Sequence, residues 1–200
     1  FVMEVEASQH ARNHTTGIKV WYRYAISGDG TLELTTRVSP RDYMTRWIPK
    51  MGIQLELDRS FRQLEWWGRG PFENYPDRKT GAKTGRYQTT VDKDYQPYLI
   101  PQDYGNRTDV VWAALTDREG RGILVSSKEF FQVSAQKYPT GHLDRARHTF
   151  QLQDRGSVTL NIDHRVSGVG GTANSVLHPY QVAPVESEFT YFIQPLKPSP

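Results

Sequence analysis

The chain has 200 residues, 25 of them lysine or arginine and 22 aspartate or glutamate, and it contains no cysteine. This length suits one well-buried domain, and the missing cysteines exclude disulfides, thiolate nucleophiles and zinc–thiolate sites. The apolar runs are strand-sized, far short of the ~20 residues of a membrane span, and the basic residues form no stripe, so neither a membrane nor a nucleic acid is an expected partner. Cytoplasm and periplasm stay equally open as compartments.

Short runs of alternating apolar and polar residues predict β-strands through the first part of the chain. Residues 18–26 and 31–38 flank an Asp-Gly turn, which tolerates the positive φ of a tight hairpin. Residues 51–57 alternate strictly, and residues 63–67 predict a strand that ends on two tryptophans, just before a glycine and proline turn.

The second part of the chain continues the same pattern. Only residues 140–148 look helical, with Thr140 as the N-cap. Because prolines interrupt the end of the chain, residues 196–200 are expected to fray. An all-β, antiparallel sandwich in a single domain over residues 1–195 is therefore predicted. Further strands are expected at residues 86–90, 109–116, 122–126, 130–134, 158–163 and 189–193.

The stretch at residues 68–78 reads Gly-Arg-Gly-Pro-Phe-Glu-Asn-Tyr-Pro-Asp-Arg, and it has the least generic chemistry of the chain. Its two prolines predict a stiff, shaped loop. Two interpretations stand side by side: a structural turn held by ion pairs, or a loop that contacts sugar hydroxyls. The residues concerned, with the tryptophan that precedes them, are Trp67, Arg69, Glu73, Asn74, Tyr75, Asp77 and Arg78.

This stretch resembles the G-x-G-P-x-E-N-Y-P-D-R signature of the C-terminal domain of bacterial β-galactosidases, the small-chain or domain 5-like part of glycoside hydrolase family two. Three more stretches agree in order: residues 101–110, residues 134–148, and Leu-Asn-Ile-Asp at residues 160–163 followed by a glycine-rich loop. In the first of these, the candidate site residues are Gln102, Asn106, Arg107 and Asp109.

The resemblance implies a β-supersandwich similar to galactose mutarotase. It also implies an accessory domain of an enzyme that hydrolyses terminal β-D-galactosides. In the family the two catalytic carboxylates lie on a separate barrel of roughly 250 residues, so no catalytic residue is expected in this chain. The domain is expected to pack against that barrel and other domains of the parent enzyme and to edge the active site, where the galactoside binds.

The glycine-rich loop carries the expected contact with substrate. In the family this loop presents a tryptophan to the sugar, whereas Val176 stands at about that place here. Asn174, Ser175 and His178 remain candidate polar contacts. The alternative is a loop that packs between domains and has no ligand role.

No cofactor or metal ion is assigned to this chain; the resemblance implies magnesium and sodium in the parent enzyme only. The family's domain is usually longer, so we expect a fragment that lacks the strands preceding Phe1. Missing strands leave unpaired sheet edges, which favour a homo-oligomer or edge pairing.

Two other functions remain open at this point. A stand-alone carbohydrate-binding module would stack a pyranose on Trp66, Trp67, Phe72 and Tyr75. A mutarotase-like protein would instead need a histidine acid and a glutamate base facing one another over a sugar. The pairs that the sequence offers for this are His178 with Glu73 or Glu186.

Overall fold

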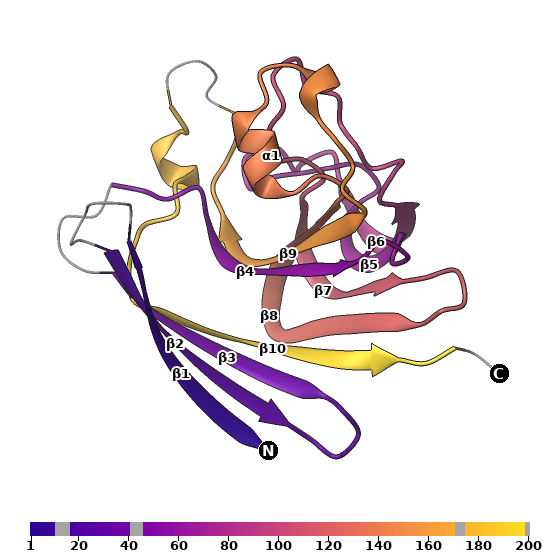
Figure 1. Cartoon of the computed structure of the whole chain (residues 1–200). Helices are drawn as coiled ribbons and strands as arrows, with labels where there is room; N and C mark the ends of the chain where they lie inside the picture. Colours follow the sequence, from indigo (N-terminus) through magenta and orange to yellow (C-terminus); the bar gives the residue numbers. More distant parts are fainter. Residues whose placement is uncertain (11–16, 41–45, 171–174, 199–200) are drawn as a thin grey trace.

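The computed structural model describes residues 1–10, 17–40, 46–170 and 175–198. The described chain is almost entirely antiparallel β-structure and folds into two layers (Figure 1). The predicted all-β sandwich is confirmed. None of the described helices is long and apolar enough to cross a membrane. The strands are β1 (Val2–His10), β2 (Gly17–Ile26), β3 (Leu32–Pro40), β4 (Lys50–Asp58), β5 (Gln63–Gly70), β6 (Lys83–Thr90), β7 (Arg107–Thr116), β8 (Gly122–Gln136), β9 (Ser157–Val166) and β10 (Ser187–Leu196).

The strands follow the order β1-β2-β3-β10-β8-β7-β5-β6, and β9 pairs with both β8 and β4. Strand β8 belongs to both layers. Residues 122–127 pair with β10, whereas residues 132–136 pair with β9. The sequence predicted two strands here, at 122–126 and 130–134. The intervening residues 128–130 are exposed and form the bend that carries one continuous strand between the layers.

The core lies between the layers and forms a single cluster. Val158, Leu160 and Ile162 alternate along β9 and are at most 1% exposed, as the period of two along a strand requires. The opposite face of β9 is also buried, but it is polar: Asn161 and Asp163 point away from the core, toward the loops that cover this layer. These loops hold the sequence motifs.

Strand β5 is longer than predicted. It continues past Trp67 to Gly70, so the glycines lie within the strand and not in a turn. A Cβ on Gly68 would lie 3.0 Å from Val110, and one on Gly70 would lie 2.7 Å from the Tyr87 ring. Close packing between strands and rings therefore explains these glycines.

The structure differs from the sequence at the end of the predicted helix and at Leu196. Helix α1 (Thr140–Arg145) ends before residue 148, and Thr140 does not cap it; its hydroxyl instead accepts a hydrogen bond from Gln54. Strand β10 reaches Leu196, which pairs with Gly122, so the tail does not fray at that residue. Pro195 is tolerated in β10 because the pairing of β10 with β3 stops at Ile193.

Strand β1 lies at the edge of the sheet and pairs only with β2 (Figure 1). Its residues are exposed or half-buried along the whole strand. An exposed edge of this length offers unpaired backbone groups to another strand. Oligomerisation of the chain stays a prediction.

Candidate functional site

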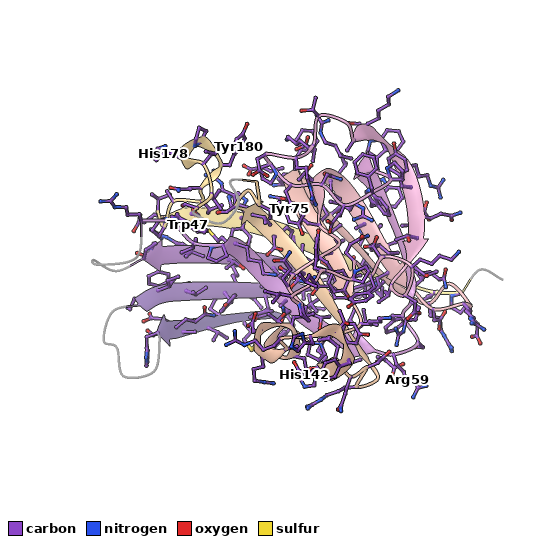
Figure 2. All side chains as sticks on the ribbon, turned by 90° about the horizontal axis from the view of Figure 1, so that it is seen from above. Trp47, Arg59, Tyr75, His142, His178 and Tyr180 are labelled. Atoms are coloured by element: carbon purple, nitrogen blue, oxygen red, sulfur yellow. The ribbon has the colours of Figure 1, made fainter. Side chains whose placement is uncertain are left out.

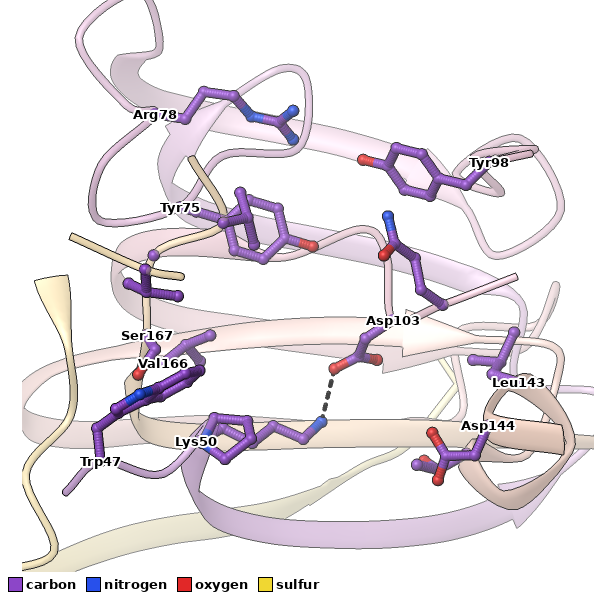
Figure 3. A pocket seen from close by; sticks show the side chains of 16 residues that line it. Trp47, Lys50, Tyr75, Arg78, Tyr98, Asp103, Leu143, Asp144, Val166 and Ser167 are labelled. Carbon is purple, nitrogen blue, oxygen red and sulfur yellow. Dashed lines mark hydrogen bonds and ion pairs between the residues drawn. The ribbon is translucent and has the colours of Figure 1, made fainter. Parts of the chain in front are cut away.

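The motif loops meet at one cavity of about 680 Å³, on the outer side of the layer that contains β4 and β9 (Figure 3). Its walls come from the signature loop (residues 68–78), the second motif (residues 101–110), helix α1 and the glycine-rich loop (residues 168–179). A fifth segment, at the start of β4, completes it. The residues that line the cavity are Trp47, Pro49, Lys50, Tyr75, Arg78, Tyr98, Gln102, Asp103, Thr140, Leu143, Asp144, Val166, Ser167, Gly168, Val169 and Val176.

Asn74 fixes the shape of the signature loop from inside the protein. It is fully buried, and its amide nitrogen donates to the carbonyl of Phe72 at 2.9 Å. Its amide oxygen accepts from the backbone N–H and the hydroxyl of Thr108 at 2.9 and 2.5 Å. These bonds tie the loop to β7, so Asn74 is structural in this protein.

Glu73 joins the signature loop to the segment before β7. Its carboxylate accepts hydrogen bonds from the Tyr98 hydroxyl, from Arg78 at 2.6 Å and from the backbone N–H of Gly105 at 2.8 Å. The Arg78 guanidinium in turn lies 5.3 Å from the centre of the Tyr75 ring. Glu73 thus positions Arg78 and Tyr98, which both line the cavity.

Asp77 holds the beginning of the glycine-rich loop. Its carboxylate accepts from the backbone N–H groups of Val169 and Gly170 at 3.1 and 2.6 Å. A Cβ on Gly168 would overlap this carboxylate, so the close approach requires glycine there. No pattern in the sequence indicates this contact between Asp77 and the glycine-rich loop.

The rest of the predicted substrate loop is only partly at the cavity. Val176 lines it, and its carbonyl accepts from Gln181 at 2.7 Å. Ser175 is exposed and does not line the cavity. His178 begins a 3-10 turn, His178–Tyr180, and lies on the outside of the loop beside Tyr180 (Figure 2). Asn174 lies outside the described residues.

The second motif is divided between the cavity and the interior. Gln102 lines the cavity. Asn106 is buried and donates to the Asn74 carbonyl and to Gln132, at 2.9 and 2.8 Å. Arg107 is buried as well and forms an ion pair with Asp94.

The charged residues of the two motifs also form a second, separate ion cluster. Asp109 accepts from Arg69 at 2.5 Å and from Lys79 at 2.8 Å. The two cations and the hydrogen bonds they donate hold the pKa of Asp109 below its usual value, against the effect of burial. None of these three residues lines the cavity, so their role is to brace the base of the signature loop.

Lys50 and Asp103 form the polar floor of the cavity, 2.9 Å apart (Figure 3). Asp163 lies close beneath, on the buried polar face of β9. Burial raises the pKa of Asp163 to about 7; the charge of Lys50 lowers it and that of Asp103 raises it. A Cβ on Gly52 would collide with Asp163, so glycine at this position makes room for the side chain; next to it, β9 bulges at His164, which has no partner in β4.

Stability should fall as Asp163 ionises. Its pKa in the folded chain is about 7, above the value of 3.8 in the unfolded chain. Between pH 3.8 and about 7 the folded chain therefore binds one proton more than the unfolded chain does. Over this range its free energy of unfolding falls by up to about 1.4 kcal/mol for each pH unit. From pH 5.5 to 7 the Asp163→Asn variant should gain about 2 kcal/mol relative to the wild type, measured by urea unfolding. Asp58→Asn, at the exposed end of β4, should show a constant difference over this range. Parallel curves for wild type and Asp163→Asn would contradict this assignment.

Sequence analysis named only four residues of this cavity as candidates, Tyr75, Arg78, Gln102 and Val176, and missed the others. Trp47 and Lys50 come from the approach to β4, Tyr98 from the loop before the second motif, and Asp144 from α1. Trp47, Lys50 and Tyr98 belong to none of the matching stretches, and Asp144 lies in the stretch at residues 134–148 without being singled out there. Only the pairing of distant strands brings them to one place, and a local pattern does not carry that information.

The alternative aromatic platform is not formed. Trp66 is fully buried and packs against Tyr87 and the Arg107 guanidinium, with ring and cation distances of 5.6 and 4.7 Å. Trp67, its neighbour on β5, points to the opposite face of the sheet and is 43% exposed. The two rings therefore cannot stack on one sugar.

The residues suggested for a mutarotase have other partners. Glu73 is held by the contacts described above, and Glu186 accepts a hydrogen bond from Ser39. Among the residues that the structure describes, no group of three or more histidine, aspartate or glutamate side chains is arranged to hold a metal ion. Magnesium and sodium in the parent enzyme stay a prediction.

Comparison with known proteins agrees with the motifs. The family model of the beta galactosidase small chain matches residues 2–193. A beta-galactosidase of Priestia megaterium is 37% identical over 148 residues, which are 74% of this chain and 14% of that protein. Beta-galactosidases of Vibrio cholerae and Photobacterium profundum are 35% and 29% identical over 162 and 196 residues, covering 81% and 94% of this chain but only 15% and 18% of theirs. Motifs, fold and matches together place this chain in the beta-galactosidase small-chain family.

Proposed function

We propose that this chain is the accessory domain of a β-galactosidase that hydrolyses terminal β-D-galactosides. In this proposal the domain packs against the catalytic barrel, edges the active site and is not catalytic alone. The supporting observation is that the motif loops converge on one cavity, to which the glycine-rich loop contributes Gly168, Val169 and Val176. The curated relatives are named beta-galactosidase, and the chain spans 14–18% of the length of the three relatives described above.

Exposed apolar side chains beside this cavity support packing against another domain. Leu99, Val169 and Leu177 are 91%, 48% and 59% exposed, and each lines the cavity or directly follows a residue that does. Large exposed apolar side chains that gather around a hollow mark surfaces where another part of a protein binds. The barrel of the parent enzyme is the partner we propose for this surface.

Hydrolysis of a panel of chromogenic β-glycosides tests the proposal. The 200-residue chain and a longer β-galactosidase polypeptide that contains it are compared on β-galactoside, β-glucoside and β-glucuronide. We expect activity only in the longer polypeptide, and only on β-galactoside. Activity in the 200-residue chain alone would show that the acid and base lie within it, and the proposal would be wrong.

Asp77 provides a sharper test of the position of the glycine-rich loop. In the longer polypeptide, Asp77→Ala should lower kcat/KM for a β-galactoside about tenfold or more, because the loop loses both backbone hydrogen bonds at the active-site edge. Asp58→Ala is a matched control, since Asp58 likewise accepts a backbone N–H, from Ser60 at 2.8 Å, but does not line the cavity. Equal kinetics for the two variants would exclude a role of this loop in activity.

A further inference from the structure

We propose that the cavity is itself a binding site for a neutral saccharide of one or two pyranose units, held by the face of Trp47 and the hydroxyl of Tyr75. This site lies within the domain and does not depend on the hydrolytic role proposed above. It also differs from the platform of Trp66 and Trp67, which the packing of these side chains excludes.

The cavity has the size and the walls of a sugar site. Its volume of about 680 Å³ falls within the range of about 300–1,000 Å³ that is typical of small-molecule sites. Trp47 is half-buried and lines the cavity, so part of its indole is accessible from the cavity. A flat aromatic face of this kind packs against the C–H groups of a pyranose. Leu143, Val166 and Val169 extend the apolar wall.

Tyr75 provides the observation that most directly indicates a ligand. The residue is only 5% exposed and lines the cavity. No hydrogen bond joins its hydroxyl to the part of the chain that the structure describes, and this oxygen is not among the fully buried polar atoms, so it is open to the cavity. The ring is held in place by the Arg78 guanidinium. A sugar hydroxyl in the cavity would supply the missing partner.

The charges of the cavity select a neutral ligand. Figure 3 shows Asp103 between the Tyr75 hydroxyl and the Lys50 ammonium, with the Asp144 carboxylate to one side. Lys50 has protons, and the carboxylates have lone pairs, beyond those used in their own 2.9 Å contact. Adjacent hydroxyls of a sugar can both accept from such a cation and donate to such carboxylates. Both cations that line the cavity are already paired, Lys50 with Asp103 and Arg78 with Glu73. An acidic sugar would therefore meet the Asp144 carboxylate, which disfavours a second negative charge.

Titration of the 200-residue chain with galactose and with lactose tests the site. Binding is followed by saturation-transfer NMR on the sugar and by tryptophan fluorescence. Trp47→Ala should weaken binding about tenfold through loss of the aromatic face, and Tyr75→Phe about fivefold through loss of one hydrogen bond. The matched controls Trp67→Ala and Tyr87→Phe should bind as the wild type does. The Trp67 ring does not line the cavity, and the Tyr87 hydroxyl donates to the Lys83 carbonyl.

Thermal unfolding of each variant establishes that it is folded before its binding is compared. The proposal is overturned if neither sugar binds the folded wild type up to high millimolar concentration. It is equally overturned if Trp67→Ala weakens binding as much as Trp47→Ala, or if glucuronate binds more tightly than galactose. Each of these results would leave the hydrolysis test of the longer polypeptide unaffected, so the two proposals fail separately.

Discussion

Replacing Arg107 by methionine should lower the free energy of unfolding by about 3–5 kcal/mol, the range measured when one partner of a buried ion pair is removed. Arg107 and Asp94 have side chains that are 1% and 5% exposed. The substitution leaves the Asp94 carboxylate inside the protein without its counter-ion. It also leaves the Gly105 carbonyl without the donor that now lies at 2.8 Å. Urea unfolding followed by circular dichroism measures the loss.

The exposed ion pair between Arg86 and Glu65 is the matched control for this prediction. The Arg86 side chain is 67% exposed, and pairs of this kind contribute about 0–1 kcal/mol. Arg86→Met should therefore change the free energy of unfolding by less than about 1 kcal/mol. If Arg107→Met costs no more than Arg86→Met, Arg107 does not stabilise the interior in the way inferred here.

Replacing Asn74 by alanine should cost about 3 kcal/mol of stability, because two buried polar groups lose their partner. These groups are the backbone N–H and the hydroxyl of Thr108, a residue that is 2% exposed. Since they tie the signature loop to β7, the loop should also lose its fixed shape. Urea unfolding gives the stability, and hydrogen exchange of the Thr108 amide reports the local effect.

Gln88 on β6 serves as the control for Asn74, because it is an exposed side chain with the same amide group. Gln88→Ala should lie within about 0.5 kcal/mol of the wild type. An Asn74→Ala variant that is as stable as Gln88→Ala would mean that the loop keeps its shape without this side chain. The structural interpretation of the signature would then be wrong.

The alternation of residues predicts most of the fold because strand formation on a half-buried sheet is a local property. It fails where the reason for a residue is long-range. Gly68 and Gly70 look like turn residues in sequence, but they are required by Val110 and the Tyr87 ring, which pack against them from neighbouring strands. The exposed break at residues 128–130 likewise resembles a turn, while in the fold it is a bend within one strand.

The candidate site shows the same limit. Motif resemblance identifies Asn74, Asp77 and Glu73 as important residues, but it does not separate structural roles from binding roles. The hydrogen bonds of these side chains make that distinction, and each lies between segments that are distant in sequence. Trp47 and Lys50 belong to no motif, so the sequence offers no signal for them. Only the pairing of β4 with β9 brings them to the cavity.

Strand β8 has a consequence for how the protein opens. Because its two halves are hydrogen-bonded into different layers, neither layer can separate from the other without breaking the same strand. Amides at the two ends of β8 should therefore exchange with solvent in one cooperative event, at the rate of global unfolding. Separation of the two layers therefore requires unfolding of the whole domain. Motions near the cavity that are faster than global unfolding take place in the loops that cover it.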